Sequence, residues 1–369
     1  MSSIDHEKQS FIDSDILSAP MNAKSKYVLV IHGGAGTMNR RDATPEQRIA
    51  YHTALRQALF AGYDVLRDGG EALDAVAAAV STMEDNPLFN AGKGAVFNNE
   101  GKTELETSIM LSKPPVAYGY IPKTRRGLSI TLLTRAKNPS KLVRALYLHP
   151  ELVPHPMISG MTAEDLGAGL GVELVDPSYF YTEKRWREHR RGLGLPEEPL
   201  PFPEDGGEIP VPLDQLPTGT VGAVALDVRG CIATLTSTGG RTNKLVGRIG
   251  DTPIMGAGFW AEEWTNGRWF FKPKPKAVGI SGTGDGDYFI RLNTAATLTH
   301  RMKLKKESLK KASKNVVEAI QRENGIGGLI SLDIDGNVST PLNSSGMYRG
   351  LIRQNGKPKT AIFDDERLE

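Results

Sequence analysis

The chain has 369 residues and a mass of 40.1 kDa, and its 39% hydrophobic and 24% charged residues permit a large apolar core and argue against general disorder. Its 45 basic and 43 acidic residues give a formal charge of +2, which argues against a dedicated binder of nucleic acid. A single cysteine, Cys231, excludes a disulfide framework and a zinc site built from cysteines.

The first 26 residues are expected to form a flexible arm. They lack the apolar core of a signal peptide, and they contain four acidic residues that a mitochondrial transit peptide would avoid: Asp5, Glu7, Asp13 and Asp15. The sequence also contains no run of 18 apolar residues. We therefore expect a cytoplasmic protein without a membrane partner.

The first elements after this arm have clear signals. Residues 27–31, YVLVI, predict a buried strand that leads into H-G-G-A-G at 32–36. A helix should follow, with Thr44 as N-cap, Pro45 in the first position and Gln47 three residues after the cap, and it should end at 69–70. Residues 71–85 predict a second helix with one apolar face.

Two similar stretches predict β-hairpins. Residues 224–234, VALDVRGCIAT, and residues 330–340, ISLDIDGNVST, each place an Asp-x-x-Gly turn between apolar strands. The second also contains D-x-D-G, but the other ligands of a calcium loop are missing, so we expect a turn. Hairpins combined with amphipathic helices predict antiparallel sheets covered by helices.

A linker is expected at about 192–219. Seven of the 22 residues at 196–217 are proline and two are glycine, a composition typical of linkers. It is preceded by a charged stretch, EKRWREHRR at 183–191, and an interdomain linker is the main interpretation, with a partner-binding basic helix as the alternative. The basic runs at 272–276 and 303–311 are expected to be solvated.

The linker ends at a candidate nucleophile, Thr220, which opens the strand TVGAVALD. A threonine hydroxyl needs a base beside it, and its own α-amine can serve once the peptide bond to Gly219 is cut. That amine has a pKa of about 7.7–8.0, which suits a general base near neutral pH. Glycine at 219 leaves the scissile carbonyl uncrowded, although an ordinary loop-to-strand junction is the alternative.

Polar residues downstream complete a candidate site. Thr238 ends the first hairpin, which should return it to Thr220. Arg248 and Asp251 could bind the carboxylate and ammonium of a zwitterion, or could pair with each other. Residues 281–287, SGTGDGD, follow an apolar run and open a helix expected at 288–300, where backbone N–H groups could bind an oxyanion.

These motifs together resemble the plant-type L-asparaginase/isoaspartyl peptidase family of N-terminal-nucleophile hydrolases. They occur in family order over residues 27–350: VIHGGAGT (30–37), NPLFNAGKGAVFN (86–98), ELETSIM (104–110), GTVGAVALD (219–227), TSTGG (236–240), TNKLVGRIGD (242–251), GTGDGD (282–287) and GGLISLDIDGN (327–337). None is decisive alone, but the ordered set is highly specific.

The resemblance implies an α+β fold, a four-layer αββα sandwich of the N-terminal-nucleophile hydrolase type. It implies cleavage between Gly219 and Thr220, with 27–219 as the α-subunit and 220–369 as the β-subunit of one domain. The two fragments stay together, and two such units form a dimer of heterodimers. The expected substrates are L-asparagine and β-aspartyl peptides, with no nucleic acid as partner.

The resemblance also assigns roles to individual residues. Thr220 is the nucleophile and Thr238 the hydroxyl beside it; Thr283 and Gly284 form the oxyanion hole. Substrate-binding residues are Arg248, Asp251, Thr283, Gly284 and Gly286, and Asn90 supports the nucleophile. No catalytic cofactor is expected. A structural sodium ion is expected on a loop formed by Met83, Glu84, Asn86, Phe89, Ala91 and Lys93.

Several residues depart from the family pattern. Glu106 replaces a usual aspartate, Arg241 replaces a usually apolar residue, and Asp285 and Asp287 stand where GHGE is common. The GDGD string leans toward an aspartylglucosaminidase-like hydrolase of glycosyl-asparagine, whereas Gly219 and TSTGG favour an asparaginase. A serine hydrolase lacks its GxSxG elbow here. A nucleotide-binding protein and an inactive scaffold are the non-enzyme alternatives.

Overall fold

Two β-sheets lie face to face in the computed structural model, which describes residues 26–38, 40–41, 43–201, 219–268 and 271–368. The larger sheet has the order β12-β11-β1-β5-β6-β2-β3-β4, and the smaller has the order β10-β9-β8-β7. The strands of the larger sheet are β1 (Val28–Gly36), β2 (Leu105–Leu111), β3 (Gly127–Leu133), β4 (Met157–Ser159), β5 (Val221–Leu226), β6 (Ile232–Thr238), β11 (Gly346–Arg353) and β12 (Lys359–Phe363). Those of the smaller sheet are β7 (Phe259–Arg268), β8 (Phe271–Gly284), β9 (Gly327–Asp333) and β10 (Val338–Ser339).

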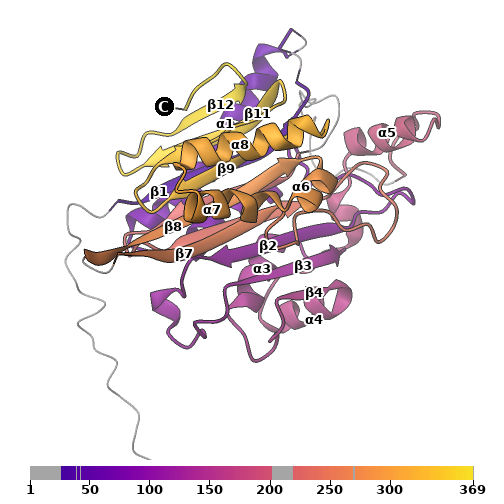
Figure 1. Cartoon of the computed structure of the whole chain (residues 1–369). Coiled ribbons are helices and arrows are strands. Elements are labelled where there is room, and N and C mark those ends of the chain that lie inside the picture. Colours follow the sequence, from indigo (N-terminus) through magenta and orange to yellow (C-terminus); the bar gives the residue numbers. More distant parts are fainter. Residues whose placement is uncertain (1–25, 39, 42, 202–218, 269–270, 369) are drawn as a thin grey trace, which may run out of the picture.

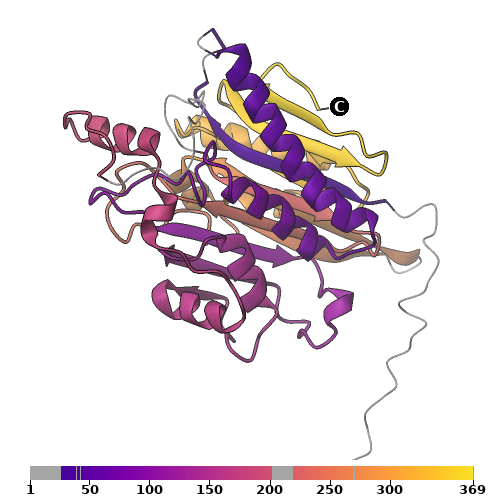
Figure 2. The same ribbon diagram turned by 180° about the vertical axis from the view of Figure 1, so that it is seen from behind.

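Helices cover the outer face of each sheet, as the two opposite views show (Figures 1 and 2). Helices α1 (Pro45–Arg67), α2 (Ala72–Glu84) and α3 (Pro139–Tyr147) pack on the larger sheet, and α7 (Thr294–Leu304) and α8 (Leu309–Arg322) pack on the smaller. The remaining helices are α4 (Gly160–Gly169), α5 (Glu183–Gly192), α6 (Gly286–Leu292) and two short 3₁₀ turns, Val116–Tyr118 and Pro177–Phe180. This arrangement confirms the four-layer αββα sandwich.

The predicted start of the first helix is confirmed in detail. The Gln47 amide donates to Thr44 Oγ1 at 3.2 Å, and the Thr44 amide donates to Gln47 Oε1 at 3.0 Å, which is a complete capping box. The second helix begins and ends one residue inside the expected range 71–85, with Glu71 at its N-cap. Local sequence signals therefore determine this part of the chain.

Both predicted hairpins are present. Strands β5 and β6 pair antiparallel from Val221 opposite Ser237 to Leu226 opposite Ile232. Strands β9 and β10 form the second hairpin. At its turn, the Asp333 carboxylate accepts hydrogen bonds from the Asn337 backbone amide and side-chain amide, each at 2.9 Å. These contacts confirm a turn, and no group of three or more metal-ligating side chains lies together among the described residues.

Two expected boundaries were wrong. Strand β1 does not end at residue 31 but continues through the H-G-G-A-G segment to Gly36, because a bulge between His32 and Gly34 lets the glycines stay paired with β11. The single helix expected at 288–300 is two helices, α6 and α7. They are separated by Asn293, whose φ of 45° is left-handed, a conformation that asparagine tolerates better than most residues.

The charged stretch 183–191 before the expected linker forms helix α5, which packs on the 94–97 segment. Arg185 is fully buried and its Nε donates to the Gly94 carbonyl at 2.9 Å, and the Trp186 ring lies 5.4 Å from that of Phe97. The predicted N-terminal arm and residues 202–218 of the linker lie outside the described residues. Within the described part of the chain, none of the helices is both long and apolar enough to span a membrane.

Candidate active site

The two threonines of the first hairpin lie side by side. Thr220 immediately precedes β5 and Thr238 ends β6, so antiparallel pairing brings them together, as the sequence predicts. Thr220 Oγ1 lies 3.3 Å from Thr238 Oγ1, and both residues are buried. Thr238 Oγ1 also accepts a hydrogen bond from the Gly240 amide at 3.0 Å. The hydroxyl beside the candidate nucleophile is therefore oriented by the backbone.

A buried histidine that the sequence analysis gave no role holds the carbonyl of Thr220. His32 Nδ1 lies 2.8 Å from Thr220 O, and its Nε2 lies 2.8 Å from Ser281 Oγ. Since a carbonyl can only accept, Nδ1 carries the proton and Nε2 accepts from Ser281. Ser281 Oγ then accepts from Thr236 Oγ1, 2.7 Å away. The only signal for this chain of hydrogen bonds in the sequence was that His32 opens the H-G-G-A-G motif.

His32 remains neutral at ordinary pH. Its complete burial lowers its pKa from 6.5 to about 3, although the hydrogen bond to Thr220 O acts in the opposite direction. Gly222 makes room for the ring, because a Cβ there would lie 2.4 Å from His32 Nε2 and 2.2 Å from Ser281 Oγ. His32 is thus a fixed donor to the Thr220 carbonyl rather than a base.

Glycines also surround the expected cleavage point. Gly34 has a φ of +115°, and a Cβ on it would lie 2.4 Å from the Gly219 Cα. The next residue, Ala35, donates its amide to Thr283 Oγ1 at 3.1 Å. The end of β1 therefore contacts both Gly219, through Gly34, and Thr283 on β8 of the opposite sheet, through Ala35.

The other members of the predicted oxyanion segment lie at the end of β8 and the start of α6. Gly284 ends β8 with a φ of +136°, and a Cβ on it would lie 2.3 Å from the Ile326 carbonyl. Gly286 begins α6, where a Cβ would lie 2.4 Å from Asp251 Oδ1. Only glycine fits at either position, and Gly286 brings this segment into contact with the predicted ammonium ligand.

Arg248 and Asp251 do not pair with each other, so the alternative interpretation of these two residues was wrong. Arg248 Nη2 instead donates to Asp287 Oδ1 at 2.9 Å. Burial raises the pKa of Asp251 to about 7, and the nearby Glu106 carboxylate raises it further. Asp251 therefore titrates near neutral pH.

Glu106 forms a hydrogen bond with the segment that carries Arg248 and Asp251. Its Oε1 accepts a hydrogen bond from the Gly250 amide at 2.8 Å, while its Oε2 is buried without a hydrogen-bond partner. Burial raises the pKa of Glu106, with the Lys244 ammonium opposing that effect. The glutamate at this departure from the family pattern thus fixes the backbone between Arg248 and Asp251.

Asn90 lies next to the Thr238 end of β6. Its side chain donates to the Gly240 carbonyl at 2.8 Å and accepts from the Val96 amide at 3.0 Å, while its carbonyl accepts from the Gly239 amide at 3.0 Å. These bonds fix the backbone that orients Thr238 Oγ1. The structure therefore places Asn90 behind the threonine pair in a supporting position.

The loop predicted to bind sodium is tightly wound. The Lys93 amide donates to the Glu84 carbonyl at 2.8 Å, and a Cβ on Gly94 would lie 2.3 Å from the Phe89 carbonyl oxygen and 2.6 Å from that of Pro87. The Glu84 side chain accepts from Ser237 Oγ at 2.7 Å. The carbonyl oxygens of Phe89 and Pro87 thus point towards Gly94, and the Glu84 side chain connects the loop to the residue beside Thr238.

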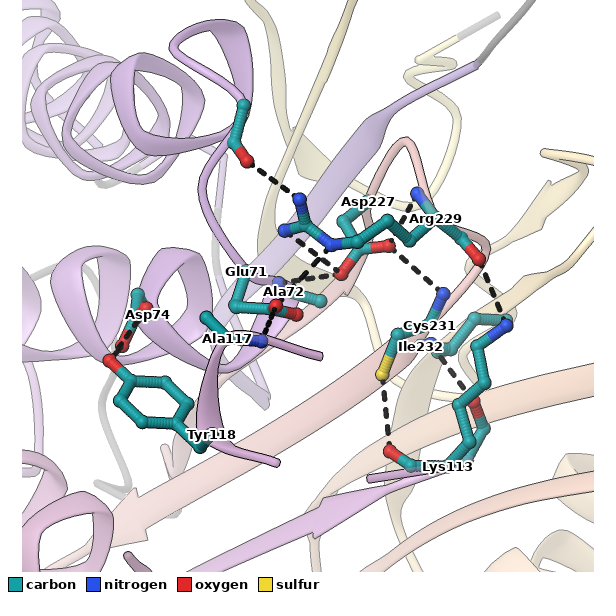
Figure 3. Close-up of polar contacts among 12 residues, drawn as sticks. Glu71, Ala72, Asp74, Lys113, Ala117, Tyr118, Asp227, Arg229, Cys231 and Ile232 are labelled. Atoms are coloured by element: carbon teal, nitrogen blue, oxygen red, sulfur yellow. Dashed lines mark hydrogen bonds and ion pairs between the residues drawn. The ribbon is translucent and has the colours of Figure 1, made fainter. Parts of the chain in front are cut away.

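A second buried polar cluster fixes the opposite end of the threonine hairpin (Figure 3). Asp227 Oδ1 accepts from the backbone amides of Arg229 and Cys231, and its Oδ2 accepts from the Ala72 amide at 3.1 Å. Glu71 Oε1 lies 3.3 Å from Arg229 Nε. This cluster ties the β5–β6 turn to the start of α2 and so holds the strand pair that positions Thr220 and Thr238.

Comparison with known proteins finds a family and relatives that match most of the chain. The sequence profile of the family described as "Asparaginase" matches residues 25–362. An isoaspartyl peptidase of Escherichia coli K12 is 36% identical over 343 residues, which cover 92% of this chain and 97% of that protein. The corresponding Salmonella typhimurium protein is 36% identical over 341 residues, 92% and 99% of the two chains. An isoaspartyl peptidase/L-asparaginase of Xenopus laevis is 32% identical over 342 residues, 92% and 94% of the two chains.

Proposed function

The chain belongs to the asparaginase family, and from this membership we propose that it is a threonine amidohydrolase that cuts itself between Gly219 and Thr220. Its reaction is hydrolysis of the side-chain amide of L-asparagine and of the β-aspartyl bond in isoaspartyl peptides. Family membership favours this activity over a serine hydrolase, a nucleotide-binding protein or a scaffold. The proposal depends most on the 3.3 Å contact between Thr220 Oγ1 and Thr238 Oγ1 directly after the linker.

Maturation uses the nucleophile on its own chain. Thr220 Oγ1 attacks the Gly219 carbonyl carbon, and the peptide nitrogen leaves as the new α-amine when the acyl group moves to oxygen. Water then hydrolyses the ester, giving the carboxylate of Gly219 and restoring the Thr220 hydroxyl beside its free α-amine. The close approach of Gly34 to Gly219 supports a backbone held for this attack.

Turnover uses the same hydroxyl with its new base. The Thr220 amine accepts the Oγ1 proton, and Oγ1 attacks the β-carbonyl of the substrate. Thr283 and Gly284 stabilise the oxyanion, and one well-placed donor is typically worth about 3–4 kcal/mol in the transition state. Ammonia or an amino acid leaves with the proton, and water then hydrolyses the β-aspartyl ester.

Substrate binding uses two charged residues that do not contact each other, Arg248 and Asp251. Arg248 binds the α-carboxylate of the substrate, and Asp251 binds its α-ammonium group. The Thr238 hydroxyl contacts the nucleophilic hydroxyl of Thr220. The raised pKa of Asp251 supports its role, since an ammonium ligand would stabilise its charged form.

A sodium ion is proposed on the 83–93 loop, where it would be structural. Hard cations prefer oxygen ligands, and the carbonyl oxygen of Phe89, which points towards Gly94, fits that preference. The ion would be held by the carbonyls of Met83, Glu84, Asn86, Phe89, Ala91 and Lys93, and it would stiffen the segment that leads through Glu84 to Ser237. The two fragments are proposed to remain one unit and to pair as a dimer of heterodimers.

The proposed cleavage is tested by comparing wild type with Thr220→Ala on a denaturing gel. Wild type should give fragments of 219 and 150 residues, the smaller one beginning TVGAV, whereas the variant should remain a single chain of 40.1 kDa. Wild-type protein that stays intact and still hydrolyses L-asparagine would disprove the mechanism.

Substrate class is tested on the mature protein with three assays: ammonia release from L-asparagine, cleavage of a β-aspartyl dipeptide, and cleavage of a glycosyl-asparagine. Activity on the first two with none on the third is expected. A rate on glycosyl-asparagine that exceeds both would instead identify the aspartylglucosaminidase-like alternative.

A further inference from the structure

One carboxylate at the edge of the site contacts two arginines. Asp287 Oδ1 lies 2.9 Å from Arg248 Nη2, and its Oδ2 lies 3.6 Å from Arg241 Nη1. The Asp287 side chain is 62% exposed and that of Arg241 53%, whereas the Arg248 side chain is only 19% exposed. The Asp287 carboxylate therefore lies largely in solvent, whereas Arg248 is mostly buried.

We propose that Asp287 competes with the substrate for Arg248. When the α-carboxylate of the substrate binds Arg248, it displaces the Asp287 carboxylate, which then pairs with Arg241. This inference rests on the proposed function, in which Arg248 binds that α-carboxylate. Asp287 occupies Nη2 of Arg248, and this nitrogen is a donor in both bidentate arrangements that a carboxylate can adopt on a guanidinium. The α-carboxylate of the substrate therefore competes with Asp287 for this nitrogen.

Arg241 lowers the electrostatic cost of displacing Asp287 from Arg248. After the exchange, two carboxylates would lie near one arginine, and like charges at such a distance repel. Arg241 already lies beside the second oxygen of Asp287, so the displaced carboxylate keeps a cationic partner. This gives a physical role to the two departures from the family pattern, Arg241 and Asp287.

The two aspartates of the GDGD string have different partners. Asp285 Oδ2 accepts a hydrogen bond from the Ile326 amide at 3.1 Å, which fixes the loop before β9. Asp287, two residues further on, instead faces the substrate-binding arginine. Because the product L-aspartate carries the same α-carboxylate, a competitor at Arg248 would also favour product release.

The inference is tested by calorimetric titration of L-aspartate into the mature protein. Asp287→Asn should bind about two- to ten-fold more tightly than wild type, because removing a competing state raises the fraction of Arg248 that is ready to bind. Asp285→Asn is the matched control, since it removes the same charge two residues away, and it should stay within about two-fold of wild type. Asp287→Ser, which also lacks the carboxylate, should reproduce the tighter binding.

Arg241 provides the second arm of the test. Arg241→Gln should weaken L-aspartate binding roughly two- to five-fold, and Arg241→Lys should restore most of it because the charge remains. In the Asp287→Asn background, Arg241→Gln should change binding by less than about two-fold, since there is no displaced carboxylate to receive.

Equal affinities for Asp287→Asn and Asp285→Asn would overturn the inference, as would an Arg241→Gln effect that is the same with and without Asp287. If wild type hydrolyses asparagine or a β-aspartyl dipeptide and yet shows either result, only this inference fails. If wild type neither hydrolyses them nor binds L-aspartate, the proposed function itself fails.

Discussion

Gly34 of β1 lies in direct backbone contact with Gly219, although the two residues are 185 positions apart in the sequence. A Cβ on Gly34 would stand 2.4 Å from the Gly219 Cα, and the φ of +115° at Gly34 is one that residues with side chains rarely adopt. The residue before the expected cut is therefore held against the larger sheet by a position where only glycine fits.

Substitution of Gly34 by alanine should block maturation. The new methyl group would push the Gly219–Thr220 link away from its position, and we expect the uncut 40.1 kDa chain to accumulate at least about ten-fold longer than in wild type, since a displacement of 1 Å can cost a hundredfold in rate. Denaturing gels over time measure this. Gly69→Ala is the control: its φ is +79°, but a Cβ there meets nothing within 4 Å, so cleavage should proceed normally. Cleavage of Gly34→Ala at the wild-type rate would contradict the expected role of this contact.

Loss of the hydroxyl at Thr238 should slow turnover. Thr238→Val removes the partner of Thr220 Oγ1 and the acceptor of the Gly240 amide, so we expect kcat to fall at least ten-fold. Thr238→Ser keeps the hydroxyl and should stay within a few-fold of wild type. Initial rates on a β-aspartyl dipeptide distinguish the two. Equal rates for the serine and valine variants would show that the hydroxyl is not needed.

Replacement of His32 should affect the position of the nucleophile without changing the pH profile. His32→Phe leaves the Thr220 carbonyl and the Ser281 hydroxyl without their partner, and each unsatisfied buried group costs about 1–3 kcal/mol. His32→Asn keeps a donor and should be closer to wild type. Denaturant unfolding and kcat measure both effects. Because the pKa of His32 is about 3, both variants should retain the wild-type pH optimum; a shifted optimum would mean that His32 titrates during catalysis.

Substrate affinity should fall on acidification because of Asp251. Its pKa of about 7 means that below this pH the carboxylate gains a proton and loses the charge that attracts the substrate ammonium. We expect KM to rise about ten-fold per pH unit below 7, while the Thr220 amine adds its own titration to kcat. In Asp251→Asn, KM should be high and independent of pH, while kcat keeps the titration of the Thr220 amine. A pH-dependent KM in Asp251→Asn would assign the titration to another group.

Much of the fold and part of the site could be predicted from local patterns. The capping box at Thr44 and Gln47 started the first helix where expected, because all its atoms come from four consecutive residues. The hairpin at 224–234 brought Thr238 to Thr220, because antiparallel pairing across a short turn determines which residues meet. The ordered motifs added the fold family, which no single element identifies.

The contacts that distinguish this site depend on how the two sheets pack. His32 and Thr220 are 188 positions apart and meet only because β1 and β5 are neighbours in the larger sheet. Ser281 joins them from the smaller sheet. Likewise, the sequence suggested that Arg248 pairs with Asp251 or a ligand, whereas the fold brought Asp287 to it from 39 positions away. Such partners are selected by long-range packing, and side-chain periodicity along the chain carries no information about them.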